Sequence, residues 1–195
     1  QAINRGKKGI TVDLKSAKGR ELVLRLARDC DVVVENFRPG VMERLGLGYE
    51  AFRAVNPGII YASASAFGRR GRWGRKPGND ILAQAAGGLM SVTGHEGTPP
   101  TPVGVAIADH IGGLTLALGI LAALLHRQRT GEGQQVETSL LGSLLAAQGW
   151  ELTYQMLSGR PLGRAGRRHP LVGHIWHVYR TADGHVAVGG VHVHR

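Results

Sequence analysis

The chain has 195 residues, of which 43% are hydrophobic, and 24 lysines and arginines against 14 acidic residues give it a formal net charge of +10. This composition is typical of a soluble globular chain. The single cysteine, Cys30, excludes a disulfide framework.

The longest uncharged apolar run covers residues 111–125. It is shorter than the roughly 18 residues that a membrane span needs. The chain also does not open on a charged segment followed by an apolar one, as a secretory signal would. We therefore expect a cytoplasmic protein that has no membrane partner.

Strands and helices are predicted to alternate along the first part of the chain. We expect a strand at residues 9–14, a helix at 17–30 with Leu22, Val23 and Leu26 on one face, and strands at 31–35 and 58–64 around a short helix. Strands separated by helices favour a parallel sheet with right-handed crossovers. Ligands of such sheets bind at the carboxyl ends of the strands, where residues 35–38 and 63–68 lie.

The second part of the chain is predicted to be mainly helical. We expect helices at residues 80–91, 109–129 and 139–157, with a strand at 134–137 between the last two. Residues 158–170 are rich in glycine, arginine and proline and are typical of a linker. Residues 179–188, with Asp183 and Gly184 at the turn, predict a β-hairpin.

Asp109 is the main candidate functional residue, because it places a carboxylate at the start of the long apolar helix. Aspartate is a preferred helix cap, and a cap is one interpretation of this residue. The other interpretation is a catalytic nucleophile that the positive end of the helix keeps ionised. Basic residues near Arg127 and a glycine at Gly131 mark the opposite end of the same helix.

Three motifs resemble the class III CoA-transferases, the family that includes formyl-CoA transferase and α-methylacyl-CoA racemase. The first is G-x-x-x-x-D-x-x-x-G around Asp109, followed by R-x-R-T-G-x-G-Q at residues 127–134. The others are residues 4–15, which match N-R-x-K-x-S-I-x-L-D-L-K, and residues 31–40, which match D-V-x-x-E-N-F-x-P-G. The resemblance extends over residues 1 to about 188.

This resemblance implies an α/β fold with a Rossmann-like parallel sheet in a large domain and the beginning of a second, smaller domain. The large CoA-binding domain would occupy residues 1–140, a helix and linker 141–165, and the start of the small domain 166–195. The family's first strand and loop would precede the chain. An interlocked homodimer is the implied assembly.

The resemblance also implies the site residues, with Asp109 as the catalytic carboxylate and acyl-CoA and a carboxylic acid as substrates. The implied coenzyme A contacts are Val12, Asp13, Leu14, Lys15, Asn36, Phe37, Arg38, Arg44, Pro77, Gly78, Asn79 and Asp80. For Lys15 and Arg44 the alternative is ordinary surface charge. The sequence contains neither a G-x-G-x-x-G motif after a strand nor a P-loop, so neither of these phosphate-binding motifs is available.

The expected reaction is CoA transfer through an acyl-aspartyl anhydride and an aspartyl-CoA thioester at Asp109. The loop that would hold the oxyanion is expected beyond Arg195. A 2-methylacyl-CoA racemase is the rival within the family, but its histidine falls at Asn79, which cannot carry a proton, and its later glutamate falls near His192. A non-catalytic CoA-binding fragment is the rival of another class.

Two further clusters suggest other partners. Residues 69–76 hold five cations and Trp73, which suits nucleic acid, the phosphates of coenzyme A or a solvated loop; no nucleic-acid recognition motif accompanies them, so we expect no nucleic acid partner. Six histidines fall between His169 and His194. Their spacing fits no zinc site, so no metal is expected. His110 is read as a helix-start residue rather than an acid–base group.

Overall fold

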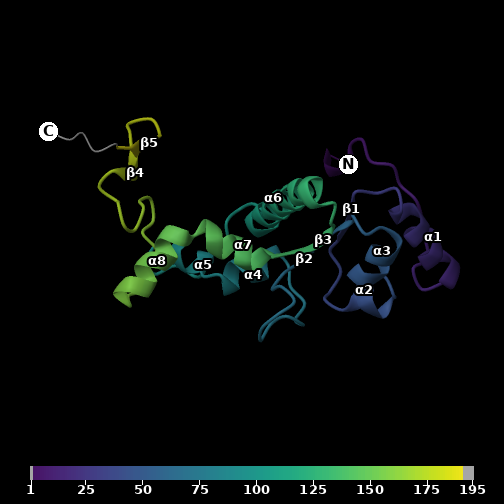
Figure 1. The fold of residues 1–195 in the computed structure, drawn as a ribbon. Helices are drawn as coiled ribbons and strands as arrows, with labels where there is room; N and C mark the ends of the chain where they lie inside the picture. The colour runs from purple at the N-terminus through teal and green to yellow at the C-terminus, as the bar shows by residue number, and fades with distance from the viewer. Residues whose placement is uncertain (1, 191–195) are drawn as a thin grey trace. The chain divides into compact units, whose positions relative to one another are not determined.

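The computed structural model describes residues 2–190, and the chain forms two compact units (Figure 1). The first unit contains the residues up to Ser63 together with Leu116–Glu137, and the second contains Ala64–Thr115 together with the residues from Thr138 onward. The division into a large domain, a linker and a small domain at residues 140 and 165 stays a prediction.

The elements follow one another in an alternating order in the first unit and are mainly helical in the second. The first unit holds η1 (Ala2–Asn4), α1 (Ala17–Ala27), β1 (Val32–Glu35), α2 (Val41–Arg44) and α3 (Tyr49–Val55). The second holds α4 (Asp80–Ala86), α5 (Leu89–Val92), α7 (Leu140–Ala147), α8 (Gly149–Ser158), β4 (Trp176–Arg180) and β5 (His185–Gly189). Residues of β2 (Ile60–Ser65), α6 (Ile107–Thr130) and β3 (Gln134–Ser139) contribute to both.

A three-stranded sheet in the order β1-β2-β3 confirms the α/β class. β1 pairs with β2 in parallel, with Val32 opposite Ile60 and Glu35 opposite Ser63. On the other side of β2, the Gly133 N–H donates to Pro57 O before the strands and the Leu141 N–H donates to Ala66 O after them. β3 therefore runs in the same direction, as the predicted βαβ order requires.

The core of the first unit lies between α1, α3 and β2. Phe52 and Tyr61 are fully buried with their ring centroids 5.6 Å apart. α1 packs on this core through Val23, Leu24 and Ala27. The predicted face of α1 is therefore wrong at Leu26, which is 47% exposed.

The predicted strand at residues 9–14 is wrong, because these residues form no ladder. A strand exists only where a neighbouring strand accepts its hydrogen bonds, and local pattern does not supply that neighbour. The segment instead ends in a turn that leads into α1, where Ser16 caps the helix by accepting from the Gly19 N–H.

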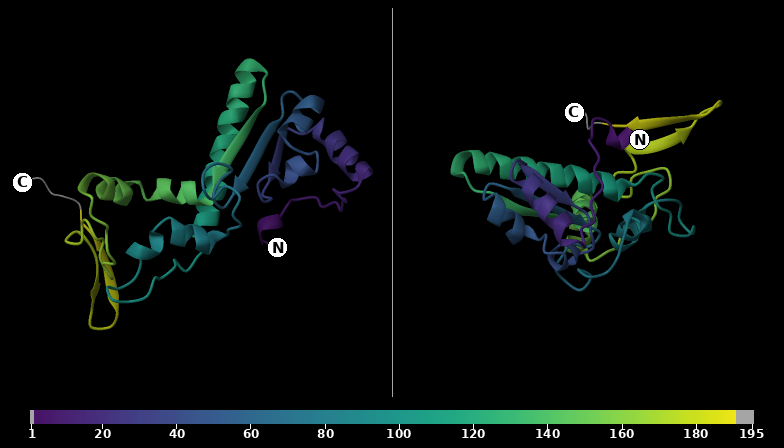
Figure 2. Two further views of the ribbon diagram at one scale, coloured as in Figure 1. Left: turned by 90° about the horizontal axis from the view of Figure 1, so that it is seen from below. Right: turned by 90° about the vertical axis from the view of Figure 1, so that its right-hand side faces the viewer.

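Two predicted helices are each broken into two. The helix expected at residues 80–91 divides into α4 and α5 at Gly88, whose φ of 77° is left-handed and ends a helix. The helix expected at 139–157 divides into α7 and α8 at Gln148. The long helix, the strand after it and the hairpin with its turn at Asp183 are confirmed, and the hairpin is yellow in Figure 2.

In the second unit, Ala83, Ala108 and Leu144 form a buried cluster that joins α4, the start of α6 and α7. Gly112 is in the same region, and a Cβ at that position would meet the Leu140 side chain at 2.7 Å. Close packing of small residues thus fixes the start of α6 against its neighbours.

α6 is long and apolar enough to cross a membrane by length and composition alone, with a mean hydropathy of 1.7 over its best window, of which 22% is buried. The uncharged run of residues 111–125 is shorter than a span, but the 24-residue helix that contains it is long enough. Helices of soluble proteins pass the same test, so a single helix of this kind is weak evidence for a span.

Candidate functional site

Asp109 lies in the first turn of α6, and the carboxylate of Asp80 caps this helix end. Asp80 Oδ1, from the first turn of α4, accepts hydrogen bonds from the Ala108 N–H at 2.7 Å and the Asp109 N–H at 3.2 Å. The interpretation of Asp109 as the helix cap is therefore wrong. Asp109 is exposed, and within residues 2–190 its carboxylate forms no hydrogen bond, which leaves it available to a substrate.

The surroundings of Asp109 raise the pKa of its carboxyl group. Desolvation by burial is the largest cause, even though the residue as a whole is exposed, and the negative charge of Asp80 is the second. The neighbouring His110 acts in the opposite direction. The expectation that the helix end holds this carboxylate ionised is therefore wrong in direction. A raised pKa makes the ionised carboxylate a stronger nucleophile.

Gln84 is a site residue that the sequence analysis missed. It is 1% exposed, and its Nε2 donates to Asp80 Oδ2 at 2.6 Å while its Oε1 accepts from the Val103 N–H at 2.9 Å. Gln84 therefore fixes the Asp80 carboxylate, and this carboxylate caps the start of α6. The signal available in the sequence was a lone amide in the apolar stretch I-L-A-Q-A-A, one helical turn after Asp80.

The predicted contact segment at residues 77–80 lies in the same unit as Asp109. A Cβ on Gly78 would meet Ala66 and Phe67 at about 2.5 Å, so only glycine fits this approach to the end of β2. Asn79 caps α4 by accepting from the Leu82 N–H at 3.4 Å. Both Asp80 oxygens are engaged within the protein. Pro77 lines an open cavity of about 350 Å³.

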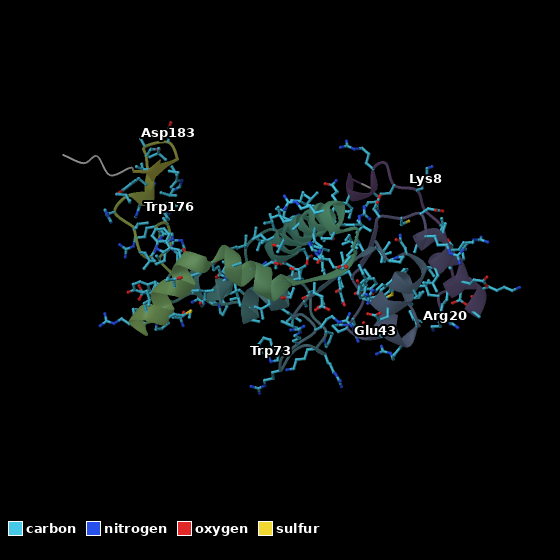
Figure 3. The ribbon with its side chains drawn as sticks, in the orientation of Figure 1. Lys8, Arg20, Glu43, Trp73, Trp176 and Asp183 are labelled. Carbon is cyan, nitrogen blue, oxygen red and sulfur yellow. The ribbon has the colours of Figure 1, made fainter. Side chains whose placement is uncertain are left out.

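The basic loop of residues 69–76 is anchored by its tryptophan, which is labelled in Figure 3. The Trp73 ring meets Phe67 edge to face at 5.2 Å, and Lys76 Nζ lies 5.5 Å from the Trp73 centroid. Trp73 and Lys76 line the same 350 Å³ cavity as Pro77. The loop therefore presents a cation beside an apolar surface next to the predicted coenzyme A segment.

The predicted contacts at Val12, Asp13, Leu14 and Lys15 lie in the first unit, in the turn before α1. Asp13 Oδ1 accepts from the Lys15 N–H at 2.9 Å, and the turn passes so close to Gly19 that a Cβ there would collide with Asp13 O. Lys15 is exposed. The segment is thus a defined turn, and within residues 2–190 its ammonium group forms no ion pair.

Asn36, Phe37, Arg38 and Arg44 also lie in the first unit, after the carboxyl end of β1. The buried Glu35 accepts from the Phe37 N–H at 2.8 Å and so fixes the start of this loop. Phe37 is 47% exposed. An apolar ring and Arg38 directly after a strand, with Arg44 on the following helix α2 (Val41–Arg44), suit a nucleotide, as expected for parallel sheets. The role of each predicted contact stays a prediction.

Within residues 2–190, no group of three or more histidines, cysteines or acidic residues is arranged to hold a metal ion. His192 and His194, part of the histidine-rich stretch, lie outside the described residues. Of the described histidines, His169 pairs with Glu151 and His177 packs on Tyr179.

Comparison with known proteins identifies the family of the chain. The profile of CoA-transferase family III matches residues 1–194, and the chain belongs to that family. It is 43% identical to an acyl-CoA transferase of Fusarium pseudograminearum, over 96% of this chain and 41% of that protein. It is 41% identical to the succinyl-CoA:mesaconate CoA-transferase of Haloarcula hispanica, over 96% of this chain and 48% of that protein.

The fold agrees with this assignment. A CAIB/BAIF family protein from Brucella suis superposes with a TM-score of 0.86 at 36% identity, covering 94% of this chain and 48% of that one. The chain thus spans about half the length of the relatives that it matches.

Proposed function

We propose that this chain carries the nucleophile of a CoA-transferase that moves CoA from an acyl-CoA to a carboxylic acid. The observation that carries the proposal is Asp109, an exposed carboxylate with a raised pKa in the first turn of α6, in a chain that belongs to CoA-transferase family III. Catalytic groups are found where burial and like charges perturb a pKa. Support comes from the Asp80–Gln84 pair, which orients the helix end.

The proposed reaction proceeds through covalent intermediates on Asp109. A carboxylate oxygen of Asp109 attacks the thioester carbonyl, and the CoA thiolate leaves, which forms an acyl-aspartyl anhydride. The thiolate then attacks the aspartyl carbonyl, which releases the donor acid and forms an aspartyl-CoA thioester. The acceptor carboxylate attacks the aspartyl carbonyl of this thioester, which releases the CoA thiolate and forms a second anhydride between the acceptor acid and Asp109. The thiolate then attacks the acceptor carbonyl of that anhydride, which forms the new acyl-CoA and frees the Asp109 carboxylate. Each step exchanges one acyl bond for another, so no ATP is consumed.

The coenzyme A contacts are proposed for two groups of residues, each described within its own unit. Lys15, Arg38 and Arg44 are exposed cations of the first unit. Residues 77–80 of the second unit adjoin the cavity lined by Trp73 and Lys76. Exposed cations also raise the local concentration of a polyanionic substrate.

Substrates with two carboxylates are the class that we propose to test first. The Haloarcula relative is named for succinyl-CoA and mesaconate, both derived from dicarboxylic acids. Asn79 supports transfer over the rival racemase reaction, because its amide caps α4 and cannot act as the general acid or base that carries an α-proton.

The decisive experiment traps the covalent intermediate. The complete protein is mixed with succinyl-CoA and then with hydroxylamine, which converts an aspartyl thioester or anhydride to an aspartyl hydroxamate. We expect peptide mass spectrometry to find the hydroxamate at Asp109 alone, and not in Asp109→Asn. Modification at another carboxylate would reject Asp109 as the nucleophile. Deuterium uptake at the α-carbon of a 2-methylacyl-CoA without acyl exchange would favour the racemase. An inert protein that still binds CoA would indicate a non-catalytic binding role.

The assembly and compartment are also proposals. Leu114, Leu118, Leu121 and Leu125 form an apolar stripe on α6, each at least half exposed. An exposed stripe of this kind is typical of an interface, which supports a homodimer. Cys30 is free and exposed, which suits the reducing cytoplasm. Light scattering on the complete protein tests the dimer, and a monomeric mass at micromolar concentration would reject it.

A further inference from the structure

The loop between α5 and α6 leads into the turn that carries Asp109. It covers residues 93–106, contains no helix or strand, and belongs with Asp109 to the second unit. Loops of this length are mobile unless side chains hold them. Gln84 holds the second half, because its Oε1 accepts from the Val103 N–H at 2.9 Å and its Nε2 donates to Val105 O at 3.5 Å. The first half is held by a different side chain.

That side chain is Arg164, which lies in the same unit between α8 and β4. Its Nη1 donates to Thr98 O at 2.8 Å, and its Nε donates to Met90 O at 3.2 Å. Met90 belongs to α5, and carbonyls in the last turn of a helix have no donor within the helix. One guanidinium therefore joins the end of α5 to residue 98 and closes the first half of the loop on itself. Beside it, the Gly166 N–H donates to Gly94 O at 3.0 Å.

These contacts depend on the particular residue types. A guanidinium directs several N–H groups along fixed directions and reaches two carbonyls at once, whereas the ammonium of a lysine acts as a single point. Within residues 2–190 the half-buried Arg164 forms no ion pair, so its bonds to the two carbonyls are its polar contacts with the protein. Gly166 has a φ of 64°, and a Cβ there would meet His95 Nδ1 at 2.7 Å. Only glycine permits this close approach.

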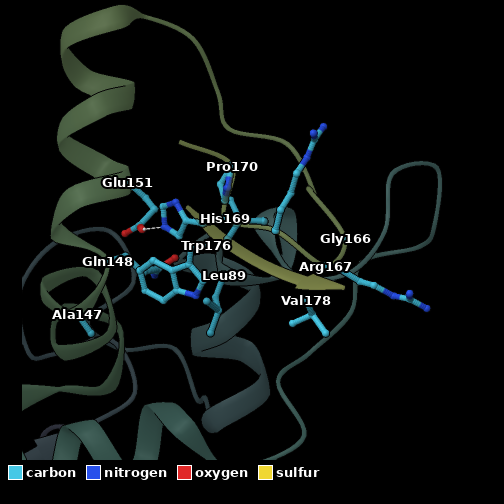
Figure 4. A pocket seen from close by; sticks show the side chains of 12 residues that line it. Leu89, Ala147, Gln148, Glu151, Gly166, Arg167, His169, Pro170, Trp176 and Val178 are labelled. Atoms are coloured by element: carbon cyan, nitrogen blue, oxygen red, sulfur yellow. Dashed lines mark hydrogen bonds and ion pairs between the residues drawn. The ribbon is translucent and has the colours of Figure 1, made fainter. Parts of the chain in front are cut away.

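The segment that carries this arginine is itself fixed. Further along it, the His169 imidazole is stacked between the rings of Trp150 and Trp176, with 5.0 Å between centroids on each side. His169 Nε2 also forms a hydrogen bond with Glu151 Oε1 at 2.9 Å, which Figure 4 shows as a dashed line. The predicted linker of residues 158–170 is thus attached to α8 and to β4. A segment held in this way can hold the loop in turn.

Two routes connect Arg164 to the first turn of α6. The first passes through α5, where Leu89 packs against the buried cluster that contains Ala108. The second passes along the loop, where residues 99–102 read Pro-Pro-Thr-Pro. Proline fixes φ, so this stiff stretch relays the position of the first half of the loop to Val103. Both routes end in the turn that carries the proposed nucleophile.

We propose that Arg164 is a positioning residue of the transfer reaction. It holds the loop before α6 and so orients the turn that presents Asp109 to the thioester. This inference rests on the proposed function, because the turn needs a defined orientation for catalysis only if Asp109 reacts. Small displacements of a reacting group lower the rate of its reaction strongly. The expected signature is a lower kcat with an unchanged KM for acyl-CoA, since none of the proposed coenzyme A contacts is altered.

The first measurement does not depend on catalysis. Hydrogen exchange of residues 103–112 is followed by mass spectrometry in the complete protein, with α1 as the internal reference. We expect Arg164→Ala to raise exchange several-fold in residues 103–112 and to leave α1 unchanged. The matched control is Arg160→Ala, because Arg160 is an exposed arginine of the same segment whose side chain forms no hydrogen bond within residues 2–190. Wild-type exchange of residues 103–112 in Arg164→Ala would overturn the proposal.

A second variant covers the case in which Arg164→Ala does not fold. Arg164→Lys keeps the charge but reaches one carbonyl at a time, so its exchange should lie between the wild-type value and that of a fully released loop. A lysine variant identical to the wild type in exchange and in kcat would show that the two-carbonyl contact has no effect on this turn, and it would overturn the proposal.

The second measurement is the rate of hydroxamate formation at Asp109 with succinyl-CoA. Arg164→Ala should lower this rate about tenfold per folded molecule, with KM unchanged, and Arg160→Ala should not lower it. Absence of the hydroxamate at Asp109 in the wild type would reject the proposed function and the positioning role together. A hydroxamate in the wild type, with an equal rate in Arg164→Ala or an equal loss in Arg160→Ala, would reject the positioning role alone.

Discussion

The two ends of α6 carry charged groups in opposite arrangements. At the C-terminal end, Arg127 donates to the Asp31 carboxylate at 2.7 Å and to Gly58 O at 3.0 Å, so a cation meets an anion and a carbonyl where the helix end is negative. At the N-terminal end, two carboxylates, Asp80 and Asp109, stand near each other and the second has a raised pKa.

The difference indicates what each end contributes. Opposite charges and satisfied carbonyls stabilise the fold at the Arg127 end. Like charges at the Asp109 end do not favour stability, and they persist because the Asp80 carboxylate is held by Gln84 and by the backbone of α6. Two like charges held close together by a hydrogen-bonded neighbour are typical of a reactive site. Four substitutions test this contrast.

Replacing Asp109 should have the largest effect on activity and almost none on stability. We expect Asp109→Asn to lower kcat of acyl exchange by on the order of 10⁴ or more, because the proposed nucleophile is lost. Its side chain supports no hydrogen bond in the described residues, so the free energy of unfolding should change by less than about 0.5 kcal/mol. Steady-state kinetics and urea unfolding measure the two quantities. Substantial residual exchange would remove Asp109 from the mechanism.

Replacing Gln84 should lower both the rate of acyl exchange and the free energy of unfolding. Gln84→Leu leaves Asp80 Oδ2 and the Val103 N–H without their partner and should cost about 1–3 kcal/mol. We also expect kcat to fall about tenfold with little change in CoA affinity, because the helix start is less well oriented. The control is Gln128→Leu, an exposed glutamine near the C-terminal end of α6. Equal behaviour of the two variants would contradict a positioning role.

Arg127 should affect stability alone. Arg127→Met removes the bonds to Asp31 and Gly58 and should lower the free energy of unfolding by about 1–2 kcal/mol. The ion pair contributes a minor part, since the Asp31 side chain is 78% exposed. The transfer rate under conditions where the variant is folded should be unchanged. A loss of rate comparable to that of Gln84→Leu would erase the distinction between the two ends.

The smallest effect is expected for the charge of Asp80. Asp80→Asn keeps the oxygen that accepts from the start of α6 and replaces the oxygen that accepts from Gln84 with an amide nitrogen. It also removes the like charge, which is the second cause of the raised Asp109 pKa after desolvation. The ionised nucleophile is lost as pH falls through that pKa, so the acid limb of the kcat/KM profile should move to lower pH in the variant. A limb that stays in place, or that moves to higher pH, would show that Asp80 does not set this pKa.

The sequence by itself determined the elements whose signals are local. Asp183 and Gly184 form the predicted hairpin turn, and the parallel pairing of β1 with β2 follows from strands separated by helices. The motif around Asp109 was enough to indicate the family to which the chain belongs. Each of these signals lies within a short window of residues, where backbone preference and side-chain type act directly.

Only the tertiary structure decided how the site is supported. The cap of α6 comes from Asp80, 29 residues earlier, and Gln84 is recognisable as its support only when Val103 is seen beside it. The failed strand at residues 9–14 and the direction of the Asp109 pKa have the same origin. Strand pairing, desolvation and charge proximity depend on neighbours distant in the chain, and a pattern of adjacent residues does not specify those neighbours.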